Sequence, residues 1–482
     1  MKELLNLTAL QLGQAIRKGE VSIPEVTRMA LDAALQDKHN CFITLNPEQA
    51  MARAEGLQQH IREAESPLYG VPTALKDNLC TRGIKTTCAS KMLDNFIPPY
   101  SAAAVDLLEH AGVISIGKTN MDEFAIGSTG KTSFFGPAEN PWSPDRSPGG
   151  SSGGSAVCVA AGTVPFSLGS DTGGSVRQPA AHCGLTGIKP TYGTVSRYGL
   201  IAYASSLDQI GPLCRDAADC AAVLDTVQMH ARRDGTSLQG EYGTLLSSLT
   251  GDVRGLKIGI PTECFGDRLN REVRRAVLAV ADVLRSRGAV VTEFSFPDIS
   301  YTVPTYYIIA CAEASSNLAR YDGVKYGYRA KGYADLEEMY RKTRTEGFGS
   351  EVKRRILLGA FVLSAEHYDA YYKKALQARE MIRNGYQTAF QSFDLLLTPV
   401  TPTTAPQLNT QADPLQRYRD DIYTVGANLA GLPALSMPCG FDAAGLPIGA
   451  QLIAPRFGEG TVLNAAHAFQ SETDFHKRRC PR

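Results

Sequence analysis

Two serines in glycine-rich runs have the residue type and setting that covalent chemistry requires. Ser175 follows a glycine pair in the run DTGGSVR at 171–177. Glycines allow successive backbone N–H groups to converge on one point, which an oxyanion hole for an acyl intermediate needs. Ser151 lies in GGSSG at 149–153, which fits the G-x-S-x-G pattern of the nucleophile elbow in serine hydrolases. Ser175 competes with Ser151 for the role of nucleophile and has the better local environment.

The elbow interpretation needs a histidine late in the chain as a partner. His367, His467 and His476 follow the elbow, but each stands in a polar, helix-like setting that is typical of a surface. His182 lies seven residues after Ser175 and is interpreted as a structural histidine whose hydrogen bonds are satisfied. These settings favour a search for a different base.

A lysine can act as the base when burial keeps its amine neutral. Lys76 is the candidate, because the apolar run GVPTAL at 70–75 comes directly before it. Such a run predicts a strand. We therefore expect Lys76 at the end of a strand rather than on the solvated face of a helix.

Two further motifs are better explained as structure than as functional sites. GVISIGKT at 112–119 matches the phosphate-loop pattern letter for letter, but three of its four variable positions are β-branched and a helix is expected before it. This run is predicted to be a strand. NMDEF at 120–124 offers two carboxylates, but Asn120 as a helix N-cap with Glu123 three residues later predicts a capping box instead.

Composition and charge exclude several classes of protein. The chain has 482 residues, with 49 Lys and Arg against 49 Asp and Glu, so its formal charge is zero. This balance excludes a broadly basic nucleic-acid coat and a polybasic membrane anchor. The eleven cysteines are odd in number and have no Cys-x-x-Cys spacing, and the eight histidines have no metal-binding pattern, so neither a disulfide framework nor a metal site is predicted. No signal peptide or membrane span is recognised, and a cytoplasmic location without membrane contact is expected.

The elements that must position these residues alternate as they do in an α/β protein. The segment 1–65 is expected to be helical and packed on the core, and the segment 66–482 to be one domain with its catalytic region at 70–215. Short β-rich runs then alternate with helices, which predicts a parallel or mixed sheet. Within this domain the expected elements are a helix at 102–110 with a strand at 113–116, an ordered and buried Gly/Ser-rich stretch at 147–175, a helix at 270–287 with a strand at 289–294, a helical insertion at about 300–390, and strands between 395 and 453.

Three motifs together resemble one known family. They are LKDN at 75–78, GGSSGGSA at 149–156 and SDTGGSVRQPA at 170–180, and the last two contain the key serines Ser151 and Ser175. This constellation is similar to that of the amidase signature family of serine amidohydrolases. The resemblance implies an α/β fold with a mixed β-sheet core surrounded by helices. It also implies site roles for six residues: Ser175 as nucleophile, Ser151 as the bridge to the base Lys76, and Thr172, Gly173 and Gly174 as an oxyanion hole that their backbone N–H groups form with that of Ser175.

Within the family, the chain resembles the glutaminase subunits of bacterial tRNA-dependent amidotransferases. Four stretches outside the triad carry this likeness: NMDEFAIG at 120–127, EASSNLARYDGVKYGY at 313–328, GFGSEVKRRILLG at 347–359 and NLAGLP at 428–433. The resemblance implies that glutamine is held by Tyr306, Arg355 and Asp421. Their chemistry suits the task, because an α-carboxylate pairs with a guanidinium and an α-ammonium with a carboxylate. Gln209 is given a possible role near this site.

The same resemblance implies partners and an activity. The chain would hydrolyse glutamine to glutamate and supply ammonia for converting Glu-tRNA(Gln) or Asp-tRNA(Asn) within a heterotrimer that contains B and C subunits. ATP and Mg²⁺ would be used by the B subunit, tRNA would bind mainly through it, and no cofactor is expected in this chain. The zero net charge agrees with a subunit that does not itself carry tRNA. The alternatives are a stand-alone amidase of the same family that acts on small carboxamides, and a non-catalytic scaffold subunit.

Overall fold

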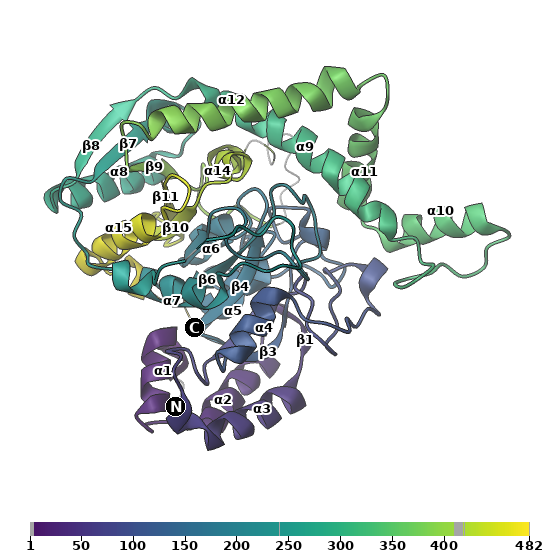
Figure 1. Ribbon diagram of the computed structural model, residues 1–482, viewed down its shortest axis with the longest axis horizontal. Helices are drawn as coiled ribbons and strands as arrows, with labels where there is room; N and C mark the ends of the chain where they lie inside the picture. Colours follow the sequence, from purple (N-terminus) through teal and green to yellow (C-terminus); the bar gives the residue numbers. More distant parts are fainter. Residues whose placement is uncertain (1–3, 241, 409–417, 419, 482) are drawn as a thin grey trace.

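One long mixed β-sheet runs through the molecule, and helices cover it (Figure 1). The computed structural model describes residues 4–240, 242–408, 418 and 420–481. Within these residues eleven strands form the sheet in the order β1-β3-β2-β4-β6-β5-β10-β11-β9-β7-β8. The pairs β2–β3, β2–β4, β7–β8 and β7–β9 are parallel and the other pairs antiparallel, which confirms the predicted α/β class. The strands are β1 (Phe42–Leu45), β2 (Pro72–Lys76), β3 (Ile114–Thr119), β4 (Phe166–Asp171), β5 (Thr186–Lys189), β6 (Gln209–Cys214), β7 (Lys257–Pro261), β8 (Val290–Phe294), β9 (Leu395–Pro399), β10 (Ala434–Phe441) and β11 (Pro447–Ile453).

The helices surround the sheet, and one of them stands apart from it. In Figure 1, α10 projects to the right, well away from the strands, at the end of a layer formed by α9, α11 and α12. No helix in the described part of the chain is both long and apolar enough to cross a membrane. The helices are α1 (Ala9–Arg17), α2 (Ile23–Leu35), α3 (Pro47–Gln59), α4 (Ala103–His110), α5 (Gly153–Ala160), α6 (Arg177–Cys183), α7 (Ala217–Val227), α8 (Arg271–Ser286), α9 (Thr302–Asn317), α10 (Leu336–Gly347), α11 (Ser350–Leu363), α12 (Lys373–Ala389), α14 (Val425–Ala430) and α15 (Glu459–Glu472).

The N-terminal segment, which was predicted to be helical, contains α1, α2 and α3 and also one strand that the sequence did not predict. Thr8 caps α1 in a complete capping box, and the Ser22 side chain caps α2. The description of this segment as helical is corrected by β1, which pairs antiparallel with β3 and forms one edge of the sheet. The four-residue run FITL is too short to show an alternating pattern, so only its tertiary pairing defines it as a strand.

The phosphate-like run and the predicted capping box have different outcomes. The run at 112–119 is a strand as predicted, since β3 includes Lys118, whose buried ammonium donates to the Leu79 carbonyl. The prediction of a capping box at Asn120 is wrong. The Asn120 side chain donates to the carbonyls of Asn40 and Gly136, while the Glu123 carboxylate accepts from Ser90 Oγ and from the backbone N–H of Gly349. These long-range hydrogen bonds use both side chains to join loops, and only a three-residue 3₁₀ turn follows.

The remaining predicted elements are present. The stretch at 147–175 is ordered and contains α5 and β4, both buried throughout. Asn270 caps α8, and β8 follows after Gly288, whose φ of +96° suits the end of a helix. The region at 300–390 is helical, with α9 packed against α11 and α12. The strands expected between 395 and 453 are β9, β10 and β11.

Candidate active site

Ser175 lies in the turn that joins the end of β4 to α6. The carboxylate of Asp171, the last residue of β4, accepts from the backbone N–H groups of Gly174 at 2.8 Å and Val176 at 3.1 Å. The Asp171 side chain thus holds the turn through hydrogen bonds to its backbone. This arrangement argues against Gly174 as an oxyanion donor, because its N–H group already points at Asp171. The donors at Thr172, Gly173 and Ser175 are not engaged by Asp171 and remain the predicted oxyanion hole.

Arg177 fixes this carboxylate. Its guanidinium donates to both oxygens of Asp171, at 2.9 and 3.0 Å, and neither side chain is exposed. The remaining donors reach the C-terminal part of the chain, namely the Thr424 carbonyl at 3.0 Å, Gln451 Oε1 at 2.6 Å and Asn428 Oδ1 at 2.5 Å. Burial alone would raise the pKa of Asp171, but the charge and hydrogen bonds of Arg177 hold it well below its usual range. The turn that contains Ser175 therefore rests on a fully ionised, fully hydrogen-bonded pair.

Lys76 is the last residue of β2, as predicted, and is completely buried. Its amine lies 2.7 Å from Ser151 Oγ, 2.8 Å from Ser152 Oγ, 2.9 Å from Ser170 Oγ and 3.1 Å from the Ser170 carbonyl. Burial lowers the pKa of Lys76 from 10.5 to about 7, although nearby carboxylates, including Asp122, partly oppose this shift. A neutral amine needs a donor for its lone pair, and the serine hydroxyls can supply one. Lys76 can therefore accept a proton near neutral pH.

Ser151 lies between Lys76 and the turn that contains Ser175. It follows a cis peptide bond after Gly150, and its carbonyl accepts from the backbone N–H of Asp122. The neighbouring N–H group of Ser152 donates to the carbonyl of Ser175 at 3.2 Å, which joins the two serine loops. Among the described residues no hydrogen bond joins the hydroxyls of Ser151 and Ser175. The structure thus contains one of the two hydrogen bonds of the predicted relay, the one between Lys76 and Ser151. It places Ser175 on a neighbouring loop.

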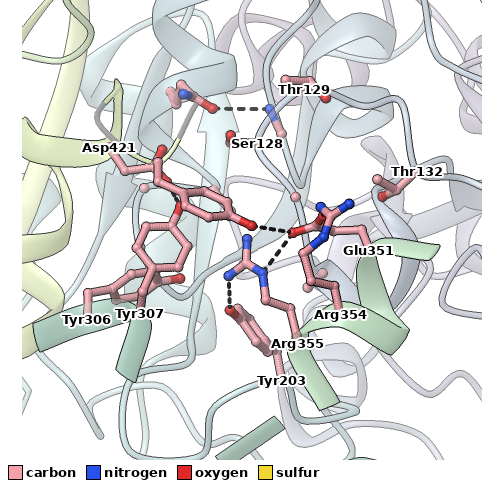
Figure 2. A pocket seen from close by; sticks show the side chains of 18 of the residues that line it. Ser128, Thr129, Thr132, Tyr203, Tyr306, Tyr307, Glu351, Arg354, Arg355 and Asp421 are labelled. Carbon is pink, nitrogen blue, oxygen red and sulfur yellow. Dashed lines mark hydrogen bonds and ion pairs between the residues drawn. The ribbon is translucent and has the colours of Figure 1, made fainter. Parts of the chain in front are cut away.

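A cavity of about 170 Å³ opens beside Ser175 and leads to a cluster of charged and aromatic side chains. Figure 2 shows Arg355 of α11 between Glu351 and Tyr203, with hydrogen bonds to both. Arg355 Nε donates to Glu351 Oε1 at 2.8 Å, and its Nη1 donates to Tyr203 Oη at 3.3 Å. Its guanidinium also stacks on the rings of Tyr307 and Tyr418, 4.6 and 4.7 Å from their centroids. Arg355 is therefore oriented by the protein before any substrate arrives.

Asp421 and the tyrosine pair complete the cavity. Tyr307 Oη donates to Asp421 Oδ2, whereas Tyr306 packs its phenol against Gly173, where a Cβ atom would approach within 2.6 Å of the ring. Burial raises the pKa of Asp421 to about 7, and the hydrogen bond from Tyr307 opposes the shift. The three residues predicted to hold glutamine thus line the same cavity as Ser175. The sequence did not indicate Tyr307 as the direct partner of Asp421.

Several other residues of the site were not predicted. Glu351, Tyr203 and Tyr418 line the cavity, and their separation in the sequence gave no motif. Asp208 accepts from Thr172 Oγ1 at 2.7 Å and from the backbone N–H of Tyr203 at 2.9 Å, so it joins the residue after β4 to the cavity wall. Thr172 and Asp208 lie 36 residues apart, which only the β4–β6 pairing brings together.

One prediction about an individual residue is corrected, and the predictions about Gln209 and about metal stay untested. Gln209 lies opposite Asp171 in the β4–β6 pairing, where its side chain accepts from the backbone N–H of Gly193 and donates to the Val195 carbonyl, and it does not line the cavity. His182 is buried, but in the described part of the chain neither of its ring nitrogens has a hydrogen-bond partner, so it is not the satisfied histidine that we expected. No cluster of His, Cys, Asp and Glu side chains suited to a metal ion occurs within the described ranges.

Comparisons with known proteins agree with this architecture. Residues 25–463 match the family model described as "Amidase". The chain is 54% identical to the A subunit of glutamyl-tRNA(Gln) amidotransferase from Agathobacter rectalis, covering 98% of this chain and 95% of the relative. It is 50% identical to the protein of the same name from Geobacter metallireducens, over 99% of both chains. A crystal structure of the protein of that name from Thermotoga maritima superposes with a TM-score of 0.81 at 38% identity, covering 98% of this chain and 95% of that one. The chain therefore belongs to the amidase signature family.

Proposed function

We propose that this chain is the glutamine-hydrolysing subunit of a tRNA-dependent amidotransferase. The observation that carries the proposal is the cavity beside Ser175, whose opposite wall presents a buried guanidinium and a buried carboxylate. A free amino acid carries both complementary charges, whereas a simple carboxamide carries neither. The similarity over nearly the whole chain to relatives named as A subunits of glutamyl-tRNA(Gln) amidotransferase supports the same conclusion.

Glutamine fits the cavity in one orientation. Its α-carboxylate would pair with Arg355, whose Nη2 atom is not used by Glu351 or Tyr203. Its α-ammonium would pair with Asp421, and a cation there would favour the ionised carboxylate. Tyr306, packed on Gly173, would contact the aliphatic part of the side chain. The amide carbon would then face Ser175.

Acylation begins with the proton of Ser175. As Ser175 Oγ attacks the amide carbon of glutamine, its proton passes through the hydroxyl of Ser151 to the neutral amine of Lys76. The backbone N–H groups at Thr172, Gly173 and Ser175 stabilise the oxyanion, and the loss of one such donor typically costs about 2.7–4 kcal/mol of barrier. The C–N bond then breaks, and the proton on Lys76 returns through Ser151 to the leaving ammonia. Ser175 is left as a γ-glutamyl ester.

Deacylation repeats these steps with water as the nucleophile. The water oxygen bonds to the ester carbon, and the bond to Ser175 Oγ breaks. One water proton reaches Ser175 Oγ by way of Ser151 and Lys76, which regenerates the free enzyme and releases glutamate. The ammonia from the first step is available to a partner subunit.

The proposal includes partners that this chain does not contain. B and C subunits would complete a heterotrimer, with ATP, Mg²⁺ and the acceptor tRNA bound mainly by B. The acceptor would be Glu-tRNA(Gln), Asp-tRNA(Asn) or both, and the complex would work in the cytoplasm. The relatives named as subunits of an amidotransferase support an assembly of several chains.

The test is ammonia release from glutamine by the purified chain, alone and mixed with B and C subunits, ATP, Mg²⁺ and misacylated tRNA. We expect slow release by the lone chain and faster release by the complete mixture. If the lone chain ignores glutamine but rapidly cleaves simple carboxamides, it is a stand-alone amidase and the proposal is wrong. Any turnover on Ser175 excludes a non-catalytic scaffold.

A further inference from the structure

A second, smaller cavity lies beside the catalytic one, and we name it the side chamber. It measures about 60 Å³, and three of its lining residues, Ser128, Thr129 and Gln178, also line the catalytic cavity. Figure 2 shows Ser128 and Thr129 at the edge of the catalytic cavity, on the side away from Arg355 and Tyr203. The residues that line only the side chamber are Lys131, Ser147, His182, Thr401, Thr403, Pro406, Gln407 and Asp420.

Helix α6 connects the two cavities. It begins two residues after Ser175, and its residues Gln178 and His182 are four apart, so they lie on the same face of the helix. The side-chain amide of Gln178 is oriented so that both its oxygen and its nitrogen have partners. In this orientation the nitrogen donates to the carbonyls of Gly150 at 3.1 Å and Ser128 at 2.8 Å. These bonds hold Gln178 as a partition between the cavities. His182 lies one helical turn beyond the partition.

His182 gives the side chamber an unusual chemical character. The residue is 3% exposed, and neither of its ring nitrogens has a partner within the described part of the chain. Nδ1 faces Gly149, where an added Cβ would come within 3.1 Å of it. Burial lowers the pKa of the imidazole to about 4, so the ring is neutral and offers one donor and one acceptor. A buried polar group without a partner destabilises the folded protein, and a small molecule that pairs with it would recover that loss.

The size and chemistry of the side chamber select its ligand. One water needs a cavity of about 10–15 Å³, so several can enter, whereas an amino acid cannot. Water both donates and accepts, as a neutral histidine requires. In the resting enzyme the side chamber fills from bulk solvent, which contains water and no ammonia. When glutamine fills the catalytic cavity, the adjoining side chamber still has room for water.

The geometry points to the side chamber as a binding site for the water that hydrolyses the ester on Ser175. This inference rests on the proposed function, because it assigns the source of the nucleophile for the second half-reaction. His182 orders the water, and Gln178 separates it from the amide during acylation. After ammonia leaves, the water moves past Gln178 and its oxygen bonds to the ester carbon. The bond from that carbon to Ser175 Oγ breaks, one water proton reaches Ser175 Oγ through Ser151 and Lys76, and glutamate is released. His182 is thus a positioning residue for water.

The test compares the two products of glutamine hydrolysis in rapid-mixing experiments on the full chain. In His182→Phe, a ring of similar size removes the donor and the acceptor. We expect ammonia to appear in a burst at the wild-type rate while glutamate release slows about tenfold or more, so that a glutamyl adduct on Ser175 accumulates in the intact mass spectrum. Hydroxylamine, which attacks the ester directly, should restore turnover and yield γ-glutamyl hydroxamate. His182→Gln keeps a donor and an acceptor and should recover part of the glutamate rate.

Matched variants isolate the contribution of His182. His110→Phe makes the same substitution on the exposed end of α4 and should behave as wild type. Thr403→Trp, at an exposed position on the chamber lining, should reproduce the slow glutamate release if His182→Phe does not fold. If both products appear together at wild-type rates in the folded variants, the side chamber holds a structural water only and the inference is wrong. It is equally wrong if ammonia release is the slowed step. A wild-type chain that never attacks glutamine refutes the proposed function instead, and the side chamber is then tested with an activated ester that acylates Ser175.

Discussion

The fall of kcat/KM at acid pH is the most direct test of Lys76 as the base. Burial moves the pKa of this lysine from 10.5 to about 7, a difference worth about 5 kcal/mol between its charged and neutral forms. At pH 7.5 a lysine with a pKa of 7 is neutral in about three quarters of the molecules, whereas an unshifted lysine is neutral in about one in a thousand. At this pH the lowered pKa therefore raises the fraction of molecules with a neutral Lys76 by almost three orders of magnitude.

The sign of the effect follows from the direction of the shift. Because the pKa is lowered, the active neutral lysine is present above about pH 7 and is lost as the pH falls through that value. Asp421, whose pKa is raised to about 7, also loses its charge in the same range and then cannot pair with the α-ammonium of glutamine. With two groups titrating, kcat/KM should approach a hundredfold fall per pH unit well below pH 6.

The assay is ammonia release at glutamine concentrations far below KM, between pH 5.5 and 8.5. We expect a plateau above about pH 8 and a steep acid limb. Asp421→Asn should lower kcat/KM at every pH but reduce the limiting slope to tenfold per pH unit, because only Lys76 then titrates. The reasoning is refuted if the wild-type rate still climbs tenfold between pH 7.5 and 8.5, since that would mean an unshifted lysine.

Three further substitutions test individual parts of the site. Ser175→Ala should abolish ammonia release without changing the thermal unfolding temperature, since the proposed nucleophile is its hydroxyl, which lies on the cavity wall. A variant that hydrolyses glutamine at the wild-type rate would contradict the assignment. Arg355→Lys should raise KM for glutamine about tenfold or more with a smaller change in kcat, because an ammonium cannot keep both the bond to Glu351 and a planar pairing with the α-carboxylate. Arg341→Lys on the exposed face of α10 is the matched control, and equal KM values in both variants would contradict the pairing. Arg177→Met should lower the free energy of unfolding by about 3–5 kcal/mol in urea titrations, because it leaves Asp171 buried without its cation. A variant as stable as wild type would show that Asp171 finds another partner.

The local motifs predicted the position of Lys76 better than the surroundings of the site. An apolar run ending in Lys76 was sufficient to predict a buried lysine at a strand end. The helices with clear caps, such as α2 and α8, were also predictable, since capping depends on residues only three positions apart.

Long-range contacts account for most of what the sequence could not predict. The strand β1 exists because β3, which lies beyond α3, β2 and α4 in the chain, pairs with it. Asn120 and Glu123 have the spacing of a capping box, but each side chain is used to bridge separate loops, and this tertiary competition prevents the helix. Gly174 was expected to donate to the oxyanion, and the carboxylate three residues before it takes that donor instead. Such outcomes depend on which atoms meet in three dimensions, and neighbouring residues do not determine them.

The contacts of Arg177 have a consequence for the biosynthesis of the enzyme. Lys76, Ser151 and Ser175 all precede Arg177 in the chain, but three acceptors of its guanidinium come from Thr424, Asn428 and Gln451. At about 5–20 residues per second, the ribosome needs roughly 14–55 s to add the 274 residues that separate Arg177 from Gln451. During that interval a nascent chain contains every proton-transfer group and the Asp171–Arg177 pair, but it lacks the three acceptors that complete the hydrogen bonds of Arg177. We therefore expect glutamine hydrolysis only from chains whose translation is nearly finished.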